Sequence, residues 1–225
     1  MKIIKITSFL LMLLASSLAK AQDWPNLNHY HIANEKLKHD SSGHVKVVYM
    51  GDSITDFWLG ASPTFFTQNN YIDRGISGQT SPQMLLRFRA DVLELKPKAV
   101  VLLCGINDIA GNTGPSTLEM IEGNITSMAE LAKANKIKMI LCSVLPANRF
   151  AWEPELQPAD SVINLNNWIK DYAKTKHLSY VDYYPAMVNE QKGLKKEYSK
   201  DGVHPNKAGY DVMEKLVQAV IKKTL

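Results

Sequence analysis

The chain has 225 residues, and its 26 Lys and Arg against 22 Asp and Glu give a formal net charge of +4. Basic and acidic residues are mixed along the chain, so the sequence lacks the basic face that is typical of nucleic-acid-binding proteins. A chain of this length makes one domain of ordinary size, which buries enough apolar surface to fold without disulfides or metals.

The first 21 residues have the pattern of a removable export signal. Lys2 and Lys5 give a basic start, residues 9–15 are a short apolar run, and 19–21 fit the small-x-small cleavage rule. The run is shorter than the roughly 20 residues that span a bilayer. We therefore expect cleavage near Ala21-Gln22, a periplasmic or secreted protein formed by 22–225, and no membrane-spanning segment in it. An uncleaved anchor is the alternative. Without the three lysines of the signal, 23 basic residues face 22 acidic ones.

Strand-like and helix-like segments alternate along the rest of the chain. Continuous apolar runs indicate strands that are buried on both faces, and apolar stripes at helical spacing indicate helices that cover them. The expected order is helix 26–39, strands 45–50 and 71–74, helix 81–95, strand 99–104, helix 117–135, strand 137–144, loop 146–158, helix 159–175, strand 178–183 and helix 207–223. This alternation predicts a three-layer α/β/α sandwich, in the flavodoxin-like class, around a five-stranded parallel sheet.

Cysteines and histidines in this chain do not form a metal-binding pattern. Cys104 and Cys142 each lie in a predicted core strand, so they are either two buried thiols or, in an oxidising compartment, a disulfide. The spacing of the early histidines matches no zinc motif, and we predict no metal and no cofactor. These histidines are His29, His31, His39 and His44.

Three polar or glycine positions follow the ends of the first three predicted strands. Ser53 follows the strand 45–50, Gly78 follows 71–74, and Asn107 follows 99–104. The carboxyl ends of parallel strands meet at one edge of the sheet, so we expect these three positions to converge. The backbone N–H groups of Ser53 and Gly78 and the amide of Asn107 are then candidate donors to an oxyanion.

A serine hydroxyl needs a base to become a nucleophile, and the base needs a group that orients it. The run Asp201-Gly202-Val203-His204-Pro205 supplies an imidazole and a carboxylate three residues apart. We predict Ser53 as nucleophile, His204 as base and Asp201 as the orienting acid.

Together these motifs resemble those of the GDSL esterases, also called SGNH hydrolases. Four blocks occur in the family's order, and the resemblance extends from about Trp24 to the end of the chain, closest to an exported bacterial branch related to platelet-activating-factor acetylhydrolases. The resemblance implies a flavodoxin-like sandwich, no metal, and hydrolysis of short acyl esters. It also implies a Ser53–His204–Asp201 triad and an oxyanion hole of Ser53, Gly78 and Asn107. The blocks are Gly51-Asp52-Ser53-Ile54, with Ile where the family name has Leu, then Gly78, Gly105-Ile106-Asn107-Asp108 and Asp201-Gly202-Val203-His204.

Other functions are compatible with parts of this pattern. An α/β-hydrolase would need Gly-x-Ser-x-Gly, and Thr55 stands where the second glycine should be, so we exclude that fold. A lysophospholipase or thioesterase would use the same site, and a noncatalytic carbohydrate- or lipid-binding module would use the same scaffold.

The expected partner is an ester of a small molecule, a glycan or a lipid, with short acyl groups such as acetyl favoured by the resemblance. Nucleic acid is not expected. Several aromatic side chains near the predicted active edge either line a substrate pocket or pack in the core: Phe57, Trp58, Phe65, Phe66, Phe150 and Trp152.

Overall fold

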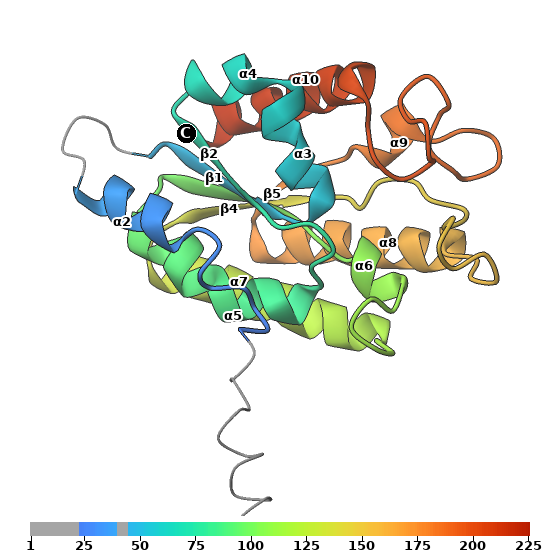
Figure 1. The fold of residues 1–225 in the computed structure, drawn as a ribbon, viewed down its shortest axis with the longest axis horizontal. Coiled ribbons are helices and arrows are strands. Elements are labelled where there is room, and N and C mark those ends of the chain that lie inside the picture. Colours follow the sequence, from blue (N-terminus) through green and yellow to red (C-terminus); the bar gives the residue numbers. More distant parts are fainter. Residues whose placement is uncertain (1–22, 40–44) are drawn as a thin grey trace, which may run out of the picture.

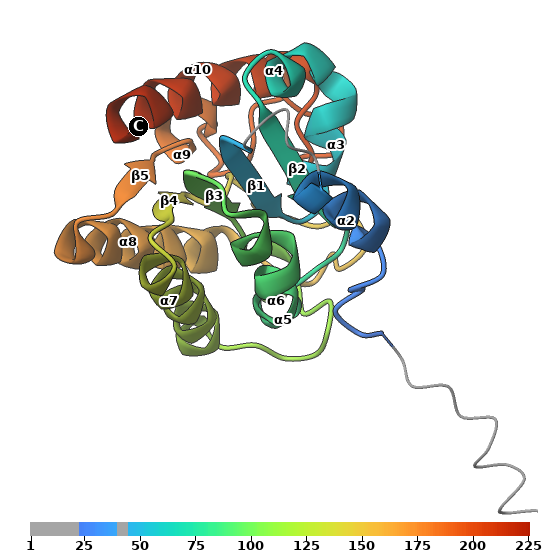
Figure 2. The same cartoon turned by 90° about the vertical axis from the view of Figure 1, so that its left-hand side faces the viewer.

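A computed structural model describes residues 23–39 and 45–225, so the expected signal segment 1–21 lies outside the described residues. Five parallel strands form one sheet in the order β2-β1-β3-β4-β5, with helices on both faces (Figures 1 and 2), which confirms the predicted α/β class. The strands are β1 (Val47–Gly51), β2 (Tyr71–Gly75), β3 (Ala99–Leu103), β4 (Lys138–Cys142) and β5 (Ser179–Val181).

All five strands lie within their predicted segments or one residue beyond them, but β4 and β5 are shorter than predicted. Apolar residues continue past both strands, and Val144 and Tyr183 are completely buried there. Their backbone groups bond to side chains and do not extend the strand ladder: Val144 pairs with the Asn166 amide, and the Tyr183 N–H donates to Ser143 Oγ. Hydrophobicity alone therefore overestimates the length of these two strands.

Two layers of helices sandwich the sheet (Figures 1 and 2). One layer holds α3 (Ser53–Ala61), α4 (Pro63–Thr67) and α10 (Lys207–Thr224), and the other holds α5 (Ser81–Asp91), α7 (Leu118–Ala134) and α8 (Ala159–Lys176). Helix α2 (His31–His39) packs beside α5 and the 3-10 turn η1 (Leu93–Leu95). Across the described part of the chain, no helix combines the length and apolar character that crossing a membrane requires.

The sequence prediction missed the short helices α3, α4, α6 (Ile106–Ile109) and α9 (Tyr184–Met187). Three of them, α4, α6 and α9, have only four or five residues, which is too short to show a repeated apolar stripe. The expected helix 26–39 is also shorter than predicted. It begins only at His31, because Asp23 ties the preceding turns together by accepting hydrogen bonds from the backbone of Leu27 and Asn28, both at 2.9 Å.

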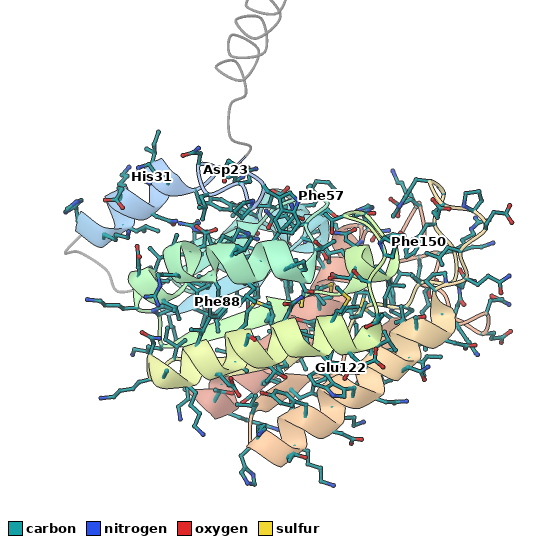
Figure 3. The ribbon with its side chains drawn as sticks, turned by 90° about the horizontal axis from the view of Figure 1, so that it is seen from below. Asp23, His31, Phe57, Phe88, Glu122 and Phe150 are labelled. Atoms are coloured by element: carbon teal, nitrogen blue, oxygen red, sulfur yellow. The ribbon has the colours of Figure 1, made fainter. Side chains whose placement is uncertain are left out.

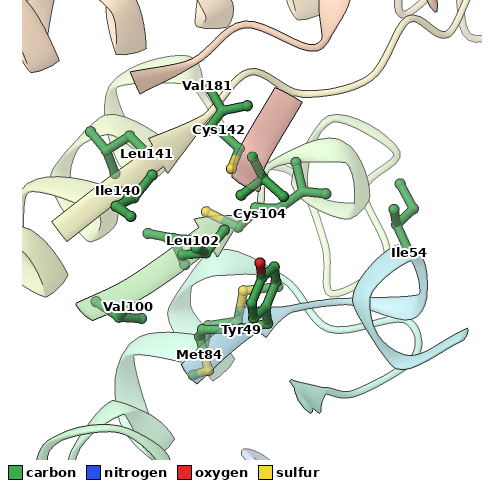
Figure 4. Packing of buried hydrophobic residues seen from close by; sticks show 14 of the residues in the cluster. Tyr49, Ile54, Met84, Val100, Leu102, Cys104, Ile140, Leu141, Cys142 and Val181 are labelled. Atoms are coloured by element: carbon green, nitrogen blue, oxygen red, sulfur yellow. The ribbon is translucent and has the colours of Figure 1, made fainter. Parts of the chain in front are cut away.

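The core is one continuous cluster that runs through the sheet and both helical layers (Figure 4). Cys104 and Cys142 lie in it as free, buried thiols, so the structure contains two thiols where a disulfide was the alternative. Burial raises the pKa of Cys142 to about 12, because the thiolate would be poorly solvated there.

Two glycines allow α3 to lie close against the sheet. Gly51 ends β1 and Gly75 ends β2, and the two residues are partners in the ladder. A Cβ added at Gly75 would lie 2.1 Å from the backbone nitrogen of Asp56, in the first turn of α3. A side chain at this position would push α3, and with it Ser53, away from the sheet edge.

Candidate active site

Ser53 is the first residue of α3, directly after the carboxyl end of β1. Asp52 caps the helix, because its Oδ1 accepts a hydrogen bond of 2.9 Å from the backbone N–H of Ile54. Ser53 is buried at this edge of the sheet, with 8% of its surface exposed. Its backbone N–H belongs to a first helical turn, where the N–H groups have no partner carbonyl within the helix and the helix dipole favours negative charge.

The structure brings Ser53 into contact with His204 from the far end of the chain. Ser53 Oγ lies 2.9 Å from His204 Nε2, and His204 Nδ1 lies 2.7 Å from Asp201 Oδ2. With Asp201 ionised, Nδ1 carries the ring proton and donates a hydrogen bond to the carboxylate. The unprotonated Nε2 then accepts a hydrogen bond from the serine hydroxyl. The three side chains form one continuous line of hydrogen bonds.

The loop that carries Asp201 and His204 is held together by its own backbone. Asp201 Oδ1 accepts hydrogen bonds from the backbone N–H groups of Val203 (2.9 Å) and His204 (2.8 Å) and from the Ser199 hydroxyl (3.0 Å). Partial burial opposes ionisation of Asp201, but these hydrogen bonds and the one from the imidazole outweigh it and hold its pKa well below the usual range. Asp201 is therefore a carboxylate at neutral pH.

Gly78 and Asn107 are joined by residues around them. The Asn107 Nδ2 donates to the carbonyl of Gln79 at 3.0 Å, and the next residue back, Gly78, has a φ of 78°, which is the left-handed region that favours glycine. Asn112 donates from its Nδ2 to Asn107 Oδ1 at 2.9 Å and to the Gly78 carbonyl at 3.4 Å. Because its Oδ1 is occupied in this way, Asn107 turns its amide N–H groups toward the loop that holds Gly78. Asn112 gave no signal in the sequence.

Asp108, next to Asn107, fastens the start of α5. Both of its carboxylate oxygens accept from the backbone N–H of Ser81 (3.0 and 2.9 Å), and Oδ1 also accepts from the Ser81 hydroxyl at 2.6 Å. Burial raises the pKa of Asp108, and the Ser81 hydrogen bonds partly offset that rise. This contact fixes the segment 78–80, which leads into α5, against the end of β3.

Asp52 is a second buried carboxyl group beside Ser53. Burial raises its pKa from 3.8 to about 7, with the hydrogen bond from Ile54 and the nearby His204 acting in the other direction. Its Oδ2 is buried and has no hydrogen-bond partner among the described residues. Near pH 7 this group is therefore divided between its neutral and charged forms, unlike Asp201.

A buried arginine supports the same edge from inside. Arg87 Nη2 donates to the carbonyl of Gly51 (3.0 Å), its Nε donates to Gln79 Oε1 (2.5 Å), and its Nη1 pairs with Asp91 (2.9 Å). The side chains of Arg87 and Asp91 are 0% and 2% exposed. One guanidinium therefore ties the residue that ends β1 to the residue after Gly78. The sequence prediction treated this part of α5 as an ordinary apolar stripe.

Of the aromatic residues that could line a pocket, only two remain exposed. Phe57 is 49% exposed, and its ring centroid lies 5.4 Å from that of His204. Trp152 is 49% exposed and stacks on the buried Phe150. The positions of Phe57 and Phe150 are shown in Figure 3. The other three pack in the core or against it, where they contact Tyr49 and one another: Trp58, Phe65 and Phe66. Phe57 is therefore the aromatic side chain next to the candidate base.

Among the residues that the structure describes, no group of three or more His, Cys, Asp or Glu side chains is placed to hold a metal ion. Ser53, His204 and Asp201 supply a hydroxyl, an imidazole and a carboxylate in one line of hydrogen bonds, and Asn107 supplies an amide after the end of the neighbouring strand β3. These are the groups that acyl transfer through a serine uses.

Two curated proteins are similar to parts of this chain. An acetylxylan esterase of Xylanibacter ruminicola is 28% identical over an alignment of 151 residues that covers 59% of this chain and 30% of that protein. An uncharacterised lipoprotein of Bacillus subtilis is 30% identical over an alignment of 124 residues that covers 48% of this chain and 51% of that protein. The matched part thus spans about a third of one relative and half of the other.

A solved structure matches almost the whole chain. The crystal structure of a GDSL-like lipase from Bacteroides thetaiotaomicron is 49% identical, with a TM-score of 0.87, over 90% of this chain and 100% of that one. The model of the GDSL-like lipase/acylhydrolase family matches residues 49–212, a range that includes Ser53, Asn107 and His204. With the fold and its serine-bearing edge in place, this match shows that the chain belongs to the GDSL-like lipase/acylhydrolase family of ester hydrolases.

Proposed function

We propose that this chain is an exported serine esterase that hydrolyses short acyl esters, with acetyl groups on glycans as its substrates. The observation that carries the proposal is the line of hydrogen bonds from Ser53 Oγ to His204 (2.9 Å) and on to Asp201 (2.7 Å). A serine, an imidazole and a carboxylate in this order activate the hydroxyl for attack on a carbonyl carbon.

In the proposed mechanism, Ser53 Oγ attacks the ester carbonyl while His204 Nε2 accepts the hydroxyl proton. Asp201 keeps its negative charge, orients the imidazole through Nδ1 and stabilises the imidazolium that forms. The tetrahedral oxyanion receives hydrogen bonds from the backbone N–H groups of Ser53 and Gly78 and from Asn107 Nδ2. Each such donor contributes roughly 10²–10³-fold to turnover in hydrolases of this kind.

Collapse of this intermediate breaks the bond to the leaving alcohol, and His204 donates the proton to the alcohol oxygen. Water then attacks the acyl-Ser53 ester, with His204 again accepting a proton. Breakdown of the second tetrahedral intermediate releases the carboxylic acid and returns the proton to Ser53. The cycle needs no cofactor, because each proton taken from a nucleophile is given to a leaving oxygen.

Three observations support the acetyl-glycan substrate and the export. The partial relative from Xylanibacter ruminicola is an acetylxylan esterase, and the one from Bacillus subtilis is a lipoprotein. The first 21 residues of the chain also have the composition of an export signal. Within the family, we place the chain with exported esterases akin to platelet-activating-factor acetylhydrolases, on the basis of its four motif blocks.

The test compares the wild-type protein with Ser53→Ala on p-nitrophenyl esters of increasing acyl length and on acetylated xylo-oligosaccharides. We expect the wild type to hydrolyse the acetyl ester fastest and the longer acyl esters progressively more slowly. Ser53→Ala should abolish hydrolysis while the thermal unfolding curve stays unchanged. A fluorophosphonate should label the wild-type protein and not the variant. Equal activity in both proteins would contradict the assignment of Ser53, and no hydrolysis with no labelling would favour a noncatalytic binding module.

A further inference from the structure

A polar cleft of about 630 Å³ borders the loop that carries Asp201. The cleft is lined by 199–202, the segment that contains Asp201, and by Asn148, Arg149 and Gln191. We call this cavity the cationic cleft. Its size lies within the range of roughly 300–1,000 Å³ that is usual for small-molecule sites.

Three exposed cations surround the cationic cleft: Arg149, Lys196 and Lys200. Within residues 23–39 and 45–225, none of the three takes part in an ion pair. Asp201 is the one carboxylate among the described residues that line the cleft, so three cations stand against one anion there. The cleft therefore presents uncompensated positive charge next to the candidate catalytic loop.

The other lining groups suit a sugar better than a lipid. Asn148 and Gln191 supply side-chain amides, and Leu194 is the one apolar side chain among the described residues that line the cleft. Leu194 is itself 4% exposed, so it offers little surface to an acyl chain. Amides and hydroxyls are the partners that sugar hydroxyl groups need for hydrogen bonds.

A second cleft, of about 510 Å³, has the opposite charge. It is lined by Asp108, Glu153 and Glu155 and by no basic residue among those described. The loop between β4 and α8 contributes to both clefts, with Arg149 to the first and the two glutamates, further along the chain, to the second. A substrate that carries a negative group is therefore attracted to one side of this loop and repelled from the other.

From this charge arrangement we infer that the cationic cleft binds a carboxylate-bearing sugar of the substrate, so that the preferred substrates are acetylated acidic glycans containing uronic acid. The inference rests on the proposed esterase function and adds the charge of the substrate to it. Arg149 and Lys196 bind the carboxylate, and the amides of the cleft bind the sugar hydroxyls.

The test uses a charge-neutralising double variant, Arg149→Gln with Lys196→Gln. It compares kcat/KM for acetylated xylo-oligosaccharides with and without a glucuronic acid branch, and for p-nitrophenyl acetate. We expect the wild type to prefer the acidic oligosaccharide by about tenfold, the double variant to lose this preference, and p-nitrophenyl acetate hydrolysis to stay unchanged. The preference should also shrink in 0.5 M NaCl, because salt screens exposed charges.

A matched control lies at the opposite edge of the sheet. A cleft of about 580 Å³ there is lined by Lys133 and Lys136, which are exposed like the two residues of the test. The double change Lys133→Gln with Lys136→Gln lowers the net charge equally, and we expect it to leave the preference for acidic oligosaccharides intact. Equal loss in both double variants would mean that overall charge and not the cationic cleft attracts the substrate, which would overturn the inference.

A binding measurement separates the inference from the esterase proposal. Titration calorimetry on Ser53→Ala should show tighter binding of an oligosaccharide with glucuronic acid than of the neutral one, and Arg149→Gln with Lys196→Gln in that background should abolish the difference. Hydrolysis of p-nitrophenyl acetate without any preference for acidic glycans overturns the inference alone. A preference for lysophosphatidic acid over acidic glycans also overturns it, because the anionic group would then belong to a lipid.

Discussion

At the residue scale, the site depends on side chains that hold other side chains in place. Asn107 could turn its amide in either direction, and Asn112 determines the direction by donating to Asn107 Oδ1 at 2.9 Å. The proposed oxyanion donor is therefore oriented by a residue five positions later in the chain. Asn112 acts through Asn107 and does not touch Ser53 or His204.

The change Asn112→Asp tests this role without altering side-chain size. A carboxylate cannot donate to Asn107 Oδ1 and would repel it, so Asn107 should no longer hold its N–H toward the oxyanion. We expect kcat on p-nitrophenyl acetate to fall about tenfold, less than the 10²–10³-fold caused by removing a donor outright. KM and the unfolding temperature should change little. In a double-mutant cycle with Asn107→Ala the two effects should not add, and full additivity would contradict the role.

Asp52 predicts an unusual dependence of stability on pH. Its pKa is about 7 in the folded protein and 3.8 is its ordinary value, so the folded state keeps its proton to a higher pH than the unfolded state does. The free energy of unfolding therefore falls as pH rises from about 4 to about 7. Each unit of pKa difference corresponds to about 1.4 kcal/mol.

Asp52→Asn removes this charge and keeps an oxygen that can accept from Ile54. We expect the variant to be more stable than the wild type at pH 8, by up to a few kcal/mol, and the difference to shrink toward pH 4. Urea denaturation at several pH values measures it. Asp73, whose pKa burial also raises to about 7, is present in both proteins and cancels in the comparison. Parallel stability curves for the two proteins would show that Asp52 does not titrate in this range.

At the element scale, the position of Ser53 is set by how closely α3 approaches the sheet. Gly75 allows the approach, because any Cβ there would meet the backbone of Asp56. The same helix is held from its other side by Tyr210, whose hydroxyl donates to the Ile54 carbonyl at 2.8 Å. Ser53, the proposed nucleophile, is thus fixed between β2 and α10.

Gly75→Ala should separate α3 from β2. We expect the free energy of unfolding to fall by about 1–3 kcal/mol. The kcat of the protein that remains folded should fall as well, because Ser53 moves with α3. Gly60→Ala, within α3 itself, is the control, since a Cβ there meets no atom within 4 Å. That change should be neutral or slightly stabilising, by up to about 1 kcal/mol. Similar losses in the two variants would show that close packing at Gly75 is not the cause.

The helix α3 also marks where sequence reasoning was insufficient. The strands and long helices carry repeated apolar patterns, and their order was sufficient to predict the sheet and its layers. The nine residues that start at Ser53 were not predicted as a helix, although the equally short α2 was, within the expected segment 26–39. The prediction therefore located Ser53 at the sheet edge and missed the helix that places it there.

At the scale of the whole molecule, the candidate site joins four separate regions of the chain at one edge of the sheet. Sequence motifs located Ser53, Asn107 and the 201–204 loop, and the structure places the serine and histidine in hydrogen-bond contact across 151 residues. The supporting contacts could not be predicted. Arg87 on α5 and Gly51 on β1 are brought together only by folding, and no spacing in the sequence records their contact.

The buried pair of Arg87 and Asp91 gives a prediction for the stability of the whole protein. Arg87→Met leaves the Asp91 carboxylate buried without its cation and should lower the free energy of unfolding by about 3–5 kcal/mol. Arg87→Met combined with Asp91→Leu should recover much of this loss, because no unpaired charge remains. Lys38→Met, which removes an exposed ion pair with Glu94, should cost less than about 1 kcal/mol. A double variant no better than Arg87→Met would show that the contact with Gly51 dominates.

The Asp201 loop has a consequence for protein engineering. Its carboxylate and imidazole are joined by hydrogen bonds whose donors and acceptors all lie within six consecutive residues, 199–204. Grafted at the mouth of another α/β scaffold, opposite a hydroxyl presented by a helix start, this segment would bring with it the contacts that pair the two groups. The remaining design step would be to place one serine hydroxyl within hydrogen-bond distance of the imidazole.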